Sequence, residues 1–229
     1  MKTKTIALIP ARGGSKRIKN KNIIEFFGRP IISYSIEEAL KSKIFDIVHV
    51  STDDIKIADI ARGLGADVSF MRDKKLADDF ATLSDVGKWV LNQFEERQGI
   101  KFDDVCTIFA CAPFIEASDL KEAFNLYRKH KREYNVWTVS EAPAKPEIYF
   151  HIKGGILEWI DERFKMARTQ DLQSAYFETG TFTIHNADVF TESKNRNILA
   201  YELPRWKAVD IDTKEDLRFA EMLFKSVRG

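Results

Sequence analysis

Apolar residues occur along most of the chain in short runs rich in β-branched side chains, and longer stretches with a helical spacing of apolar positions separate these runs. The short runs predict strands and the longer stretches predict amphipathic helices. We expect strands at residues 5–9, 46–51, 67–71, 105–110, 135–139, 181–185 and 207–211. We expect helices at residues 31–40, 55–62, 83–96, 119–131 and 214–227, with Pro30 in the first turn of the first helix. This alternation is typical of an α/β fold with a mostly parallel central sheet flanked by helices.

Residues 142–172 interrupt the alternation. Two prolines are followed by two short apolar runs, at residues 148–152 and 156–160, on either side of Gly154-Gly155. This pattern predicts a β-hairpin that projects from the main sheet. A lone hairpin with many apolar side chains is marginally stable and needs a surface to cover it. Within a single domain spanning residues 1–229, we therefore expect an inserted hairpin that acts in dimerisation or as a lid. The alternative is a hairpin folded back on its own domain.

Charge and composition exclude several classes of partner. The chain has 36 Lys and Arg against 35 Asp and Glu, so its net charge of +1 gives no reason to expect nucleic acid or a membrane surface. It has neither a secretory signal nor the roughly 20 consecutive apolar residues of a spanning helix, which favours a cytoplasmic protein. Cys106 and Cys111 have a spacing that puts them on opposite faces of a strand, and we expect two buried thiols without a disulfide.

A strongly basic loop follows the first predicted strand. The chain contains no acidic residue before Glu25, and Gly13-Gly14 would let backbone N–H groups approach an anion. Open α/β sheets bind ligands beyond the carboxyl ends of their strands, where this loop falls. The loop matches neither the Walker A pattern nor the dinucleotide fingerprint. It predicts an anion-binding site, and the alternative is a solvated basic turn. The basic residues are Lys2, Lys4, Arg12, Lys16, Arg17, Lys19 and Lys21.

Two aspartates follow one another near the C-terminus. Asp210 and Asp212 lie two apart in or just after the predicted strand at 207–211, so their side chains would point to the same side. Such a pair suits one or two Mg²⁺ ions whose coordination is completed by substrate phosphates. An Asp-x-Asp motif by itself is also compatible with capping at a strand end. Thr213 and Asp216 have near capping-box spacing for the last helix.

The basic loop resembles a known signature. Ile9-Pro10-Ala11-Arg12-Gly13-Gly14-Ser15-Lys16-Arg17, followed by Lys21-Asn22-Ile23, is similar to the opening motif of the CMP-sialic acid synthetases. The resemblance covers nearly the whole chain. It implies a Rossmann-like nucleotidyltransferase that, with Mg²⁺, transfers CMP from CTP to the anomeric hydroxyl of a nine-carbon acidic sugar and releases pyrophosphate. The alternatives are a relative using an eight-carbon sugar acid, a catalytically silent nucleotide-binding protein and a Rossmann dehydrogenase.

The resemblance also implies roles for individual residues. It places the CTP phosphates and ribose on the loop, at Ala11, Arg12, Gly13, Gly14, Ser15, Lys16, Lys21 and Asn22, with Asn22 at the ribose. The segment 70–82 is similar to the family's cytosine-reading segment and supplies Arg72, Ala81 and Thr82. Asp210 and Asp212 would bind the metal and, together with Arg12, Lys16 and Lys21, would carry the electrostatics of catalysis.

The sugar acceptor is expected to contact a second set of residues. The segment 168–180 resembles the family's acceptor region, in which Arg168 would pair with the sugar carboxylate beside Gln170, Tyr176 and Gly180. Phe109 stands where sialic acid synthetases usually carry a glutamine, which indicates a less hydroxylated acceptor. The chain therefore looks closer to the pseudaminic acid cytidylyltransferases, with sialic or legionaminic acid as alternatives. The resemblance further implies a homodimer formed through the hairpin, and a product used to glycosylate bacterial surface structures such as flagellin.

Overall fold

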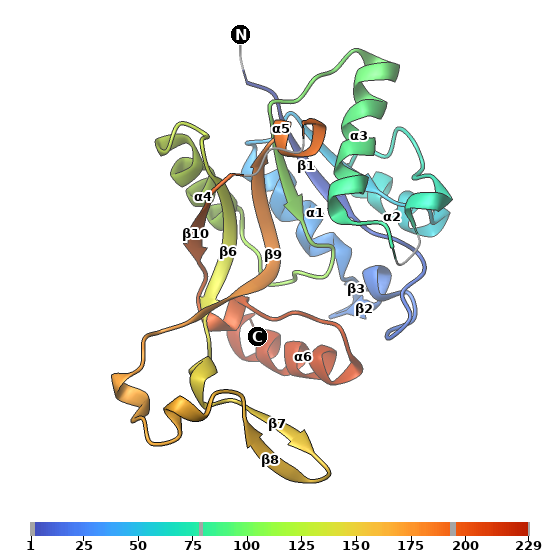
Figure 1. Ribbon diagram of the computed structural model, residues 1–229. Coiled ribbons are helices and arrows are strands. Elements are labelled where there is room, and N and C mark those ends of the chain that lie inside the picture. Colours follow the sequence, from blue (N-terminus) through green and yellow to red (C-terminus); the bar gives the residue numbers. More distant parts are fainter. Residues whose placement is uncertain (1–2, 78–79, 193–195, 229) are drawn as a thin grey trace.

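A six-stranded sheet forms the centre of the molecule, and the computed structural model describes residues 3–77, 80–192 and 196–228 (Figure 1). The strand order is β10-β6-β9-β5-β1-β4. β9 runs antiparallel to both of its neighbours, whereas the other neighbouring pairs are parallel, which confirms the mostly parallel α/β fold. The strands are β1 (Thr5–Pro10), β4 (Ile47–Ser51), β5 (Asp104–Ile108), β6 (Asn135–Glu141), β9 (Tyr176–Asn186) and β10 (Ile198–Glu202).

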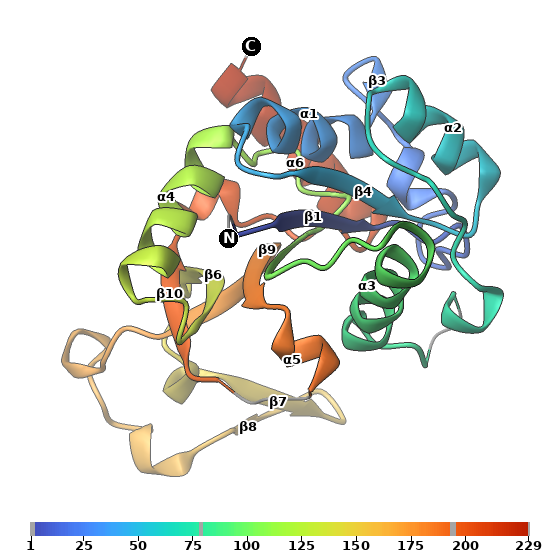
Figure 2. The same ribbon diagram turned by 90° about the horizontal axis from the view of Figure 1, so that it is seen from above.

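Helices cover both faces of this sheet (Figure 2). Alternate residues of β1 point to opposite faces, so Ala7 and Ile9 pack with α1, α2 and α4 while Ile6 and Leu8 pack with α3 and α5. A parallel strand buried on both faces explains why the first apolar run contains no polar alternation. The helices are α1 (Ile32–Ser42), α2 (Ile55–Gly63), α3 (Leu83–Gln98), α4 (Ala117–Lys129), α5 (Asp188–Thr191) and α6 (Lys214–Arg228).

Two of the predicted strands are wrong. Residues 67–71 form only an isolated bridge between Asp67 and His49. The Asp67 carboxylate accepts from Ser69 N at 3.3 Å, a local turn contact that competes with strand pairing. Residues 207–211 follow the 3₁₀ turn η6 (Arg205–Lys207) as irregular chain, because β10 occupies the sheet edge beside β6.

The start of the first helix also differs from its prediction. Pro30 ends the short strand β3 (Arg29–Pro30), which pairs with β2 (Glu25–Phe26), and α1 begins two residues later at Ile32. Proline lacks the N–H that a central strand would need, and in this two-residue pairing it sits at the end of its strand. The remaining predicted helices are confirmed within a few residues at each end.

The projecting hairpin is confirmed. β7 (Phe150–Lys153) and β8 (Ile156–Trp159) pair antiparallel around Gly154 and Gly155, which both have positive φ angles, 57° and 84°. Figure 1 shows the hairpin extending away from the sheet, between the 3₁₀ turns η3 (Pro146–Ile148) and η4 (Glu162–Phe164). Ile152 and Ile156 are 74% and 69% exposed, so the hairpin does not fold back on its own domain.

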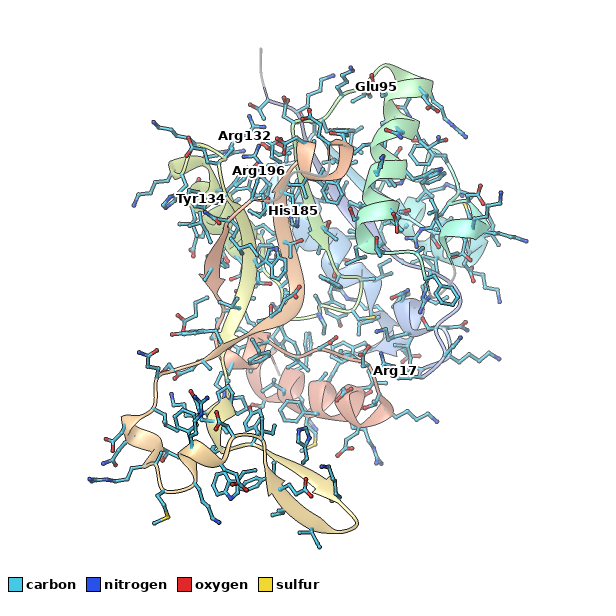
Figure 3. The ribbon with its side chains drawn as sticks, in the orientation of Figure 1. Arg17, Glu95, Arg132, Tyr134, His185 and Arg196 are labelled. Carbon is cyan, nitrogen blue, oxygen red and sulfur yellow. The ribbon has the colours of Figure 1, made fainter. Side chains whose placement is uncertain are left out.

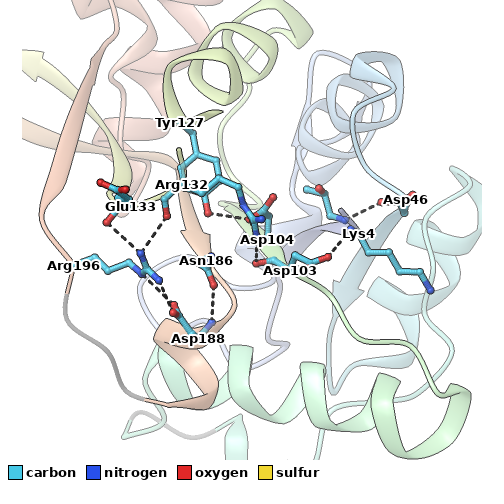
Figure 4. A network of polar contacts seen from close by, with 11 residues as sticks. Lys4, Asp46, Asp103, Asp104, Tyr127, Arg132, Glu133, Asn186, Asp188 and Arg196 are labelled. Carbon is cyan, nitrogen blue, oxygen red and sulfur yellow. Dashed lines mark hydrogen bonds and ion pairs between the residues drawn. The ribbon is translucent and has the colours of Figure 1, made fainter. Parts of the chain in front are cut away.

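Polar contacts connect the segments at the amino-terminal ends of β1 and β5 (Figure 4). The buried Asp104 carboxylate accepts from Tyr127 Oη at 2.9 Å and pairs with Arg132 Nη2 at 2.7 Å. The backbone N–H of Lys4 donates to Asp103 at 2.8 Å. Arg132, Arg196 and His185 lie at this end, whereas Arg17 lies at the opposite end near α6 (Figure 3). This network fixes the starts of the parallel strands and leaves their carboxyl ends for a ligand.

A buried ion pair anchors the irregular chain before α6. Lys207 Nζ donates to Asp119 Oδ2 at 2.8 Å and to Glu116 Oε2 at 2.7 Å, both at the beginning of α4. The predicted capping box is confirmed, because Thr213 N donates to Asp216 Oδ2 at 2.7 Å and Asp216 N donates to Thr213 Oγ1 at 3.2 Å. These two anchors bracket Asp210 and Asp212.

We expect Lys207→Ala to lower the free energy of unfolding by about 3 kcal/mol, because it leaves the buried Asp119 carboxylate unpaired. Arg228→Ala is the matched control, since this more exposed side chain contacts Glu116 at 3.2 Å, and it should cost less than about 1 kcal/mol. Urea unfolding followed by circular dichroism measures both values. Equal losses in the two variants would contradict the anchoring role.

Candidate active site

A cavity of about 300 Å³ lies beyond the carboxyl ends of β1 and β5. Its walls come from the basic loop after β1, the segment after β5, the start of α3 with the loop before it, one residue of β9 and the irregular chain before α6. Distant parts of the sequence therefore meet at the edge of the sheet where α/β proteins bind ligands. The predicted site residues among the lining are Arg12, Ser15, Lys16, Lys21, Asn22, Arg72, Ala81, Phe109, Gly180, Asp210 and Asp212.

The basic loop and the aspartates are in direct contact. Lys21 Nζ lies 2.9 Å from Asp212 Oδ1 and donates to the carbonyl of Ile211 at 3.0 Å. Arg17 Nη2 lies 2.7 Å from the other carboxylate oxygen of Asp212. Lys21 belongs to the 3₁₀ turn η1 (Lys21–Ile23), which begins after Asn20 in the left-handed region with a φ of 56°. The same-side argument from strand geometry was wrong, yet both aspartates do line one cavity.

The two carboxylates have opposite electrostatic environments. The hydrogen bond from Lys21 holds the pKa of Asp212 below its usual value. Burial, followed by repulsion from Asp212, raises the pKa of Asp210. Within residues 3–77, 80–192 and 196–228, the Asp210 carboxylate makes no hydrogen bond or ion pair. A half-buried carboxylate without a partner is a favourable place for a cation.

The donor set fits Mg²⁺ bound together with a phosphate substrate. Mg²⁺ is commonly held by one or two carboxylates, with phosphates and waters completing its shell, and Asp210 and Asp212 supply two. The described part of the chain contains no group of three or more His, Cys, Asp or Glu side chains arranged as a metal site. A third carboxylate ligand is not needed for this type of coordination. Gly180 lies beside Asp210 and has a φ of 60°, which favours glycine, whereas a Cβ there would be in ordinary contact at 3.5 Å from Asp210 Cγ.

The Asn22 side chain holds the backbone of the basic loop in place. Its Nδ2 donates to the carbonyl of Arg12 at 2.9 Å, and its Oδ1 accepts from the Cys111 thiol at 3.5 Å. Cys111 lines the cavity, and burial raises the pKa of its thiol to about 12. Both cysteines are free, as predicted, and Cys106 is fully buried. The expected contact of Asn22 with ribose stays a prediction.

Arg72 is buried at the back of the cavity. Its Nε and Nη2 donate to the hydroxyl and carbonyl of Ser51 at 3.0 and 2.5 Å. Burial lowers its pKa to about 10, so the guanidinium remains protonated at neutral pH. Thr82 does not line the cavity but begins α3 in a capping box with Asp85. Residues 78–79 of this segment lie outside the described residues.

The two loop glycines differ in their surroundings. The N–H of Gly13 donates to Asp53 Oδ1 at 3.0 Å, and a Cβ at this position would stand 2.8 Å from Asp54 Oδ2. A Cβ at Gly14 would meet nothing within 4 Å. Neither glycine lines the cavity, and neither does the buried Ala11, whose N–H donates to the carbonyl of Ser51 at 2.9 Å. Their contacts with CTP stay predictions.

The predicted acceptor residues are divided between two places. Phe109 and Gly180 line the cavity, whereas Arg168 and Gln170 lie outside it on the projecting part of the chain and Tyr176 lies outside it at the start of β9. Arg168 and Gln170 belong to the exposed turn η5 (Thr169–Asp171) and its cap. The single chain does not bring these five residues together.

Sequence reasoning missed several lining residues. Arg17 was counted among the basic residues but was given no role, although it contacts Asp212. The others are mostly apolar and carry no chemical signal of their own in the sequence. The missed residues are Pro10, Arg17, Ile18, Leu76, Leu83, Val86, Ala110 and Cys111.

The fold and this cavity define an α/β protein with a mixed-charge site, basic on one wall and acidic on the other, at the carboxyl edge of its sheet. The family model for cytidylyltransferases matches residues 6–225, and the chain belongs to this family of nucleotidyltransferase enzymes. This family assignment replaces the alternative hypothesis of a Rossmann dehydrogenase. No helix in the described ranges has the length and apolar character required to cross a membrane.

Named relatives agree with this family assignment, and a solved structure agrees with the fold. The chain is 38% identical to a pseudaminic acid cytidylyltransferase of Campylobacter jejuni, over 97% of each protein. It is 30% identical to an N-acylneuraminate cytidylyltransferase of Streptococcus agalactiae, over 93% of the chain and 51% of that relative. A CMP:2-keto-3-deoxy-manno-octonic acid synthetase solved with CTP has the same fold, with a TM-score of 0.72 and 17% identity over 98% of this chain and 99% of the other.

We expect Lys21→Ala to lower kcat/KM for CTP by about 100-fold, since it removes a cation that faces Asp212 inside the cavity. Lys19→Ala is the matched control, because Lys19 is an exposed cation of the same loop outside the cavity lining. Pyrophosphate release and CTP binding by calorimetry provide the measurements. Unchanged kinetics in Lys21→Ala would mean that the loop is only a solvated turn.

Proposed function

We propose that this protein transfers the cytidylyl group of CTP to the anomeric hydroxyl of a nonulosonic acid and releases pyrophosphate. The observation that carries the proposal is the meeting of the cationic loop and the two aspartates in one cavity, with Lys21 bonded to Asp212. The relatives named for pseudaminic and N-acylneuraminic acid support the class of acceptor. Because an intact loop and both carboxylates are present, a catalytically silent nucleotide-binding protein is the weaker alternative.

The loop binds the triphosphate in this proposal. Arg12, Ser15, Lys16 and Lys21 face the cavity and can neutralise charge as it develops on the departing pyrophosphate. Arginine and lysine supply this stabilisation without exchanging a proton. Arg72 donates to cytosine and Ala81 contacts the base through its backbone, while Asn22 is placed at the ribose.

Asp210 and Asp212 hold Mg²⁺. When bound there, the ion lowers the pKa of the attacking hydroxyl and neutralises charge on the α-phosphate. Asp212 is ion-paired with Lys21 and Arg17, and both cations line the cavity in which the phosphates would bind. Asp210 contributes a carboxylate that makes no hydrogen bond or ion pair in the described part of the chain.

The transfer is direct and needs no protein nucleophile. The sugar hydroxyl oxygen forms a bond to the α-phosphorus while the bond between that phosphorus and the bridging oxygen to the β-phosphate breaks. Pyrophosphate leaves with the bonding electrons, and the hydroxyl proton passes to solvent. Positioning and charge stabilisation supply most of the catalysis, as in other phosphoryl transfers.

The acceptor in this proposal is pseudaminic acid. Phe109 presents an apolar ring to the cavity, next to Ala110 and Cys111, and such a wall favours an acceptor with fewer hydroxyl groups. The relative at 38% identity is named for the same sugar acid, pseudaminic acid. Sialic acid and legionaminic acid are the alternatives that the experiment below separates.

We further propose a homodimer formed through the hairpin. Exposed apolar side chains on β7 and β8, such as Ile152 and Ile156, form a surface that a second copy would bury. A partner subunit docked there would bring Arg168 and Gln170 of η5 and its cap, and Tyr176 at the start of β9, to the neighbouring cavity and complete the acceptor site. We place the reaction in the cytoplasm, where CTP is available.

Incubation of the enzyme with CTP, Mg²⁺ and each of the three sugar acids should give CMP-pseudaminic acid as the fastest product, scored by mass. Phe109→Gln should shift the ratio of kcat/KM toward sialic acid by about tenfold, because an amide can pair with a hydroxyl that phenylalanine leaves unpaired. Faster turnover of sialic acid by the wild-type protein would overturn the proposed acceptor.

Asp212→Ala should lower kcat by about 1,000-fold or more, while circular dichroism shows an intact fold. Asp59→Ala is the matched control, because Asp59 is an exposed acid on α2 that pairs with Arg62 Nη1 at 3.2 Å. Pyrophosphate release during a Mg²⁺ titration provides the measurement. Near-normal activity of Asp212→Ala in Mg²⁺ would refute the metal assignment.

A further inference from the structure

The turn that follows β4 lies directly behind the basic loop. We call residues 51–54 the β4 turn; they are Ser51, Thr52, Asp53 and Asp54. β1 and β4 run side by side in Figure 2, and their parallel pairing continues to Pro10 and Ser51. Beyond that point, Ala11 N donates to the carbonyl of Ser51 at 2.9 Å and Gly13 N donates to Asp53 Oδ1 at 3.0 Å. The first residues of the loop, Ala11 and Gly13, are therefore attached to the β4 turn.

The same turn holds Arg72. The backbone N–H of Arg72 donates to the carbonyl of Thr52 at 2.7 Å, and its guanidinium donates to the hydroxyl and carbonyl of Ser51 at 3.0 and 2.5 Å. Residues 51–54 do not themselves line the cavity. The β4 turn thus connects the proposed phosphate loop to the proposed base-reading arginine without touching the ligand space.

Gly13 fits this connection because it has no side chain. A Cβ at residue 13 would stand 2.8 Å from Asp54 Oδ2 and 2.9 Å from Asp54 Cβ, which is closer than such atoms approach. Asp54 cannot easily move away, since it caps α2 by accepting from Lys56 N at 2.7 Å. The close approach of the loop to the β4 turn therefore depends on glycine at residue 13 and on the fixed position of Asp54.

The Asp53 carboxylate has a second effect. Burial lowers the pKa of Arg72; the negative charge of Asp53 opposes this shift, whereas the positive charge of Arg12 adds to it. Both arginines line the cavity, so they repel each other across the space that CTP would occupy. A carboxylate behind the loop offsets that repulsion without entering the site.

We propose that Asp53 is a positioning residue for CTP: through its hydrogen bond to Gly13 N–H it fixes the phosphate loop at the distance from Arg72 that one nucleotide spans. This inference rests on the proposed function, because it takes CTP as the ligand. If only the negative charge of Asp53 mattered, the opposite effect on CTP binding would be expected. Removing an acid from beside a cationic loop would strengthen the binding of an anion.

Asp53→Ala removes both the hydrogen bond and the charge, whereas Asp53→Asn keeps an oxygen that can accept from Gly13 N–H. We expect the alanine variant to raise the Kd and the KM for CTP about tenfold, the scale of one lost hydrogen bond to a charged group. The asparagine variant should stay within about threefold of the wild type. The kcat at saturating CTP and the KM for the sugar acid should be unchanged in both.

Asp59→Ala is the control, because it removes the same charge from α2 at a side chain that is 68% exposed. Calorimetry with CTP and steady-state kinetics measure all three variants. The proposal is overturned if Asp53→Ala binds CTP as tightly as the wild type or more tightly. It is also overturned if Asp53→Asn is as weak as Asp53→Ala, or if kcat falls while the KM for CTP is unchanged, as loss of folded protein would produce.

Gly13→Ala supplies an independent arm, because its Cβ would press against Asp54 and should raise the Kd for CTP as Asp53→Ala does. Failure of the proposed function is distinguishable from failure of this inference. If the wild type binds CTP but transfers it to no sugar acid, the calorimetric comparison still decides the role of Asp53. If the wild type binds no CTP, inorganic tripolyphosphate is titrated instead, and equal affinities of the wild type and Asp53→Ala overturn the inference.

Discussion

The ion pair between Lys21 and Asp212 joins two parts of the chain that are 191 residues apart. One partner belongs to the loop after the first strand and the other to the irregular segment before the last helix, so the cavity between them exists only when both segments are in place. Each side chain also neutralises the other inside a partly buried site, which keeps both charged groups compatible with folding.

Rigid supports hold this charged pair from outside the cavity. On the acidic side, Lys207 is buried against Asp119 and fixes the approach to Asp210. On the basic side, Asn22 and the β4 turn fix the loop through backbone contacts. Preorganised charges lose little free energy to rearrangement when a substrate arrives, and this is the usual source of electrostatic catalysis. The supporting residues are therefore as important for the site as those that face the ligand.

The hairpin differs from the central sheet in how much of it is buried. Most residues of β1, β4, β5 and β6 are buried, whereas β7 and β8 consist almost entirely of exposed residues. Two strands cannot bury enough apolar surface to be stable by themselves, so the hairpin depends on contact with another surface. The proposed dimer would satisfy this requirement and would also explain why Arg168, Gln170 and Tyr176 lie away from the cavity in the single chain.

The sequence by itself determined the α/β class, most helices and the hairpin, because these follow from local periodicity and glycine pairs, and its clustered positive charge marked the basic loop. It misassigned residues 67–71 and 207–211, since a short apolar run has the same pattern whether it pairs in a sheet or packs elsewhere. Only the tertiary structure decided that β10 forms the sheet edge, that Arg17 reaches Asp212 and that Asp53 bonds to Gly13. Such contacts join segments far apart in the chain, and no local pattern encodes them.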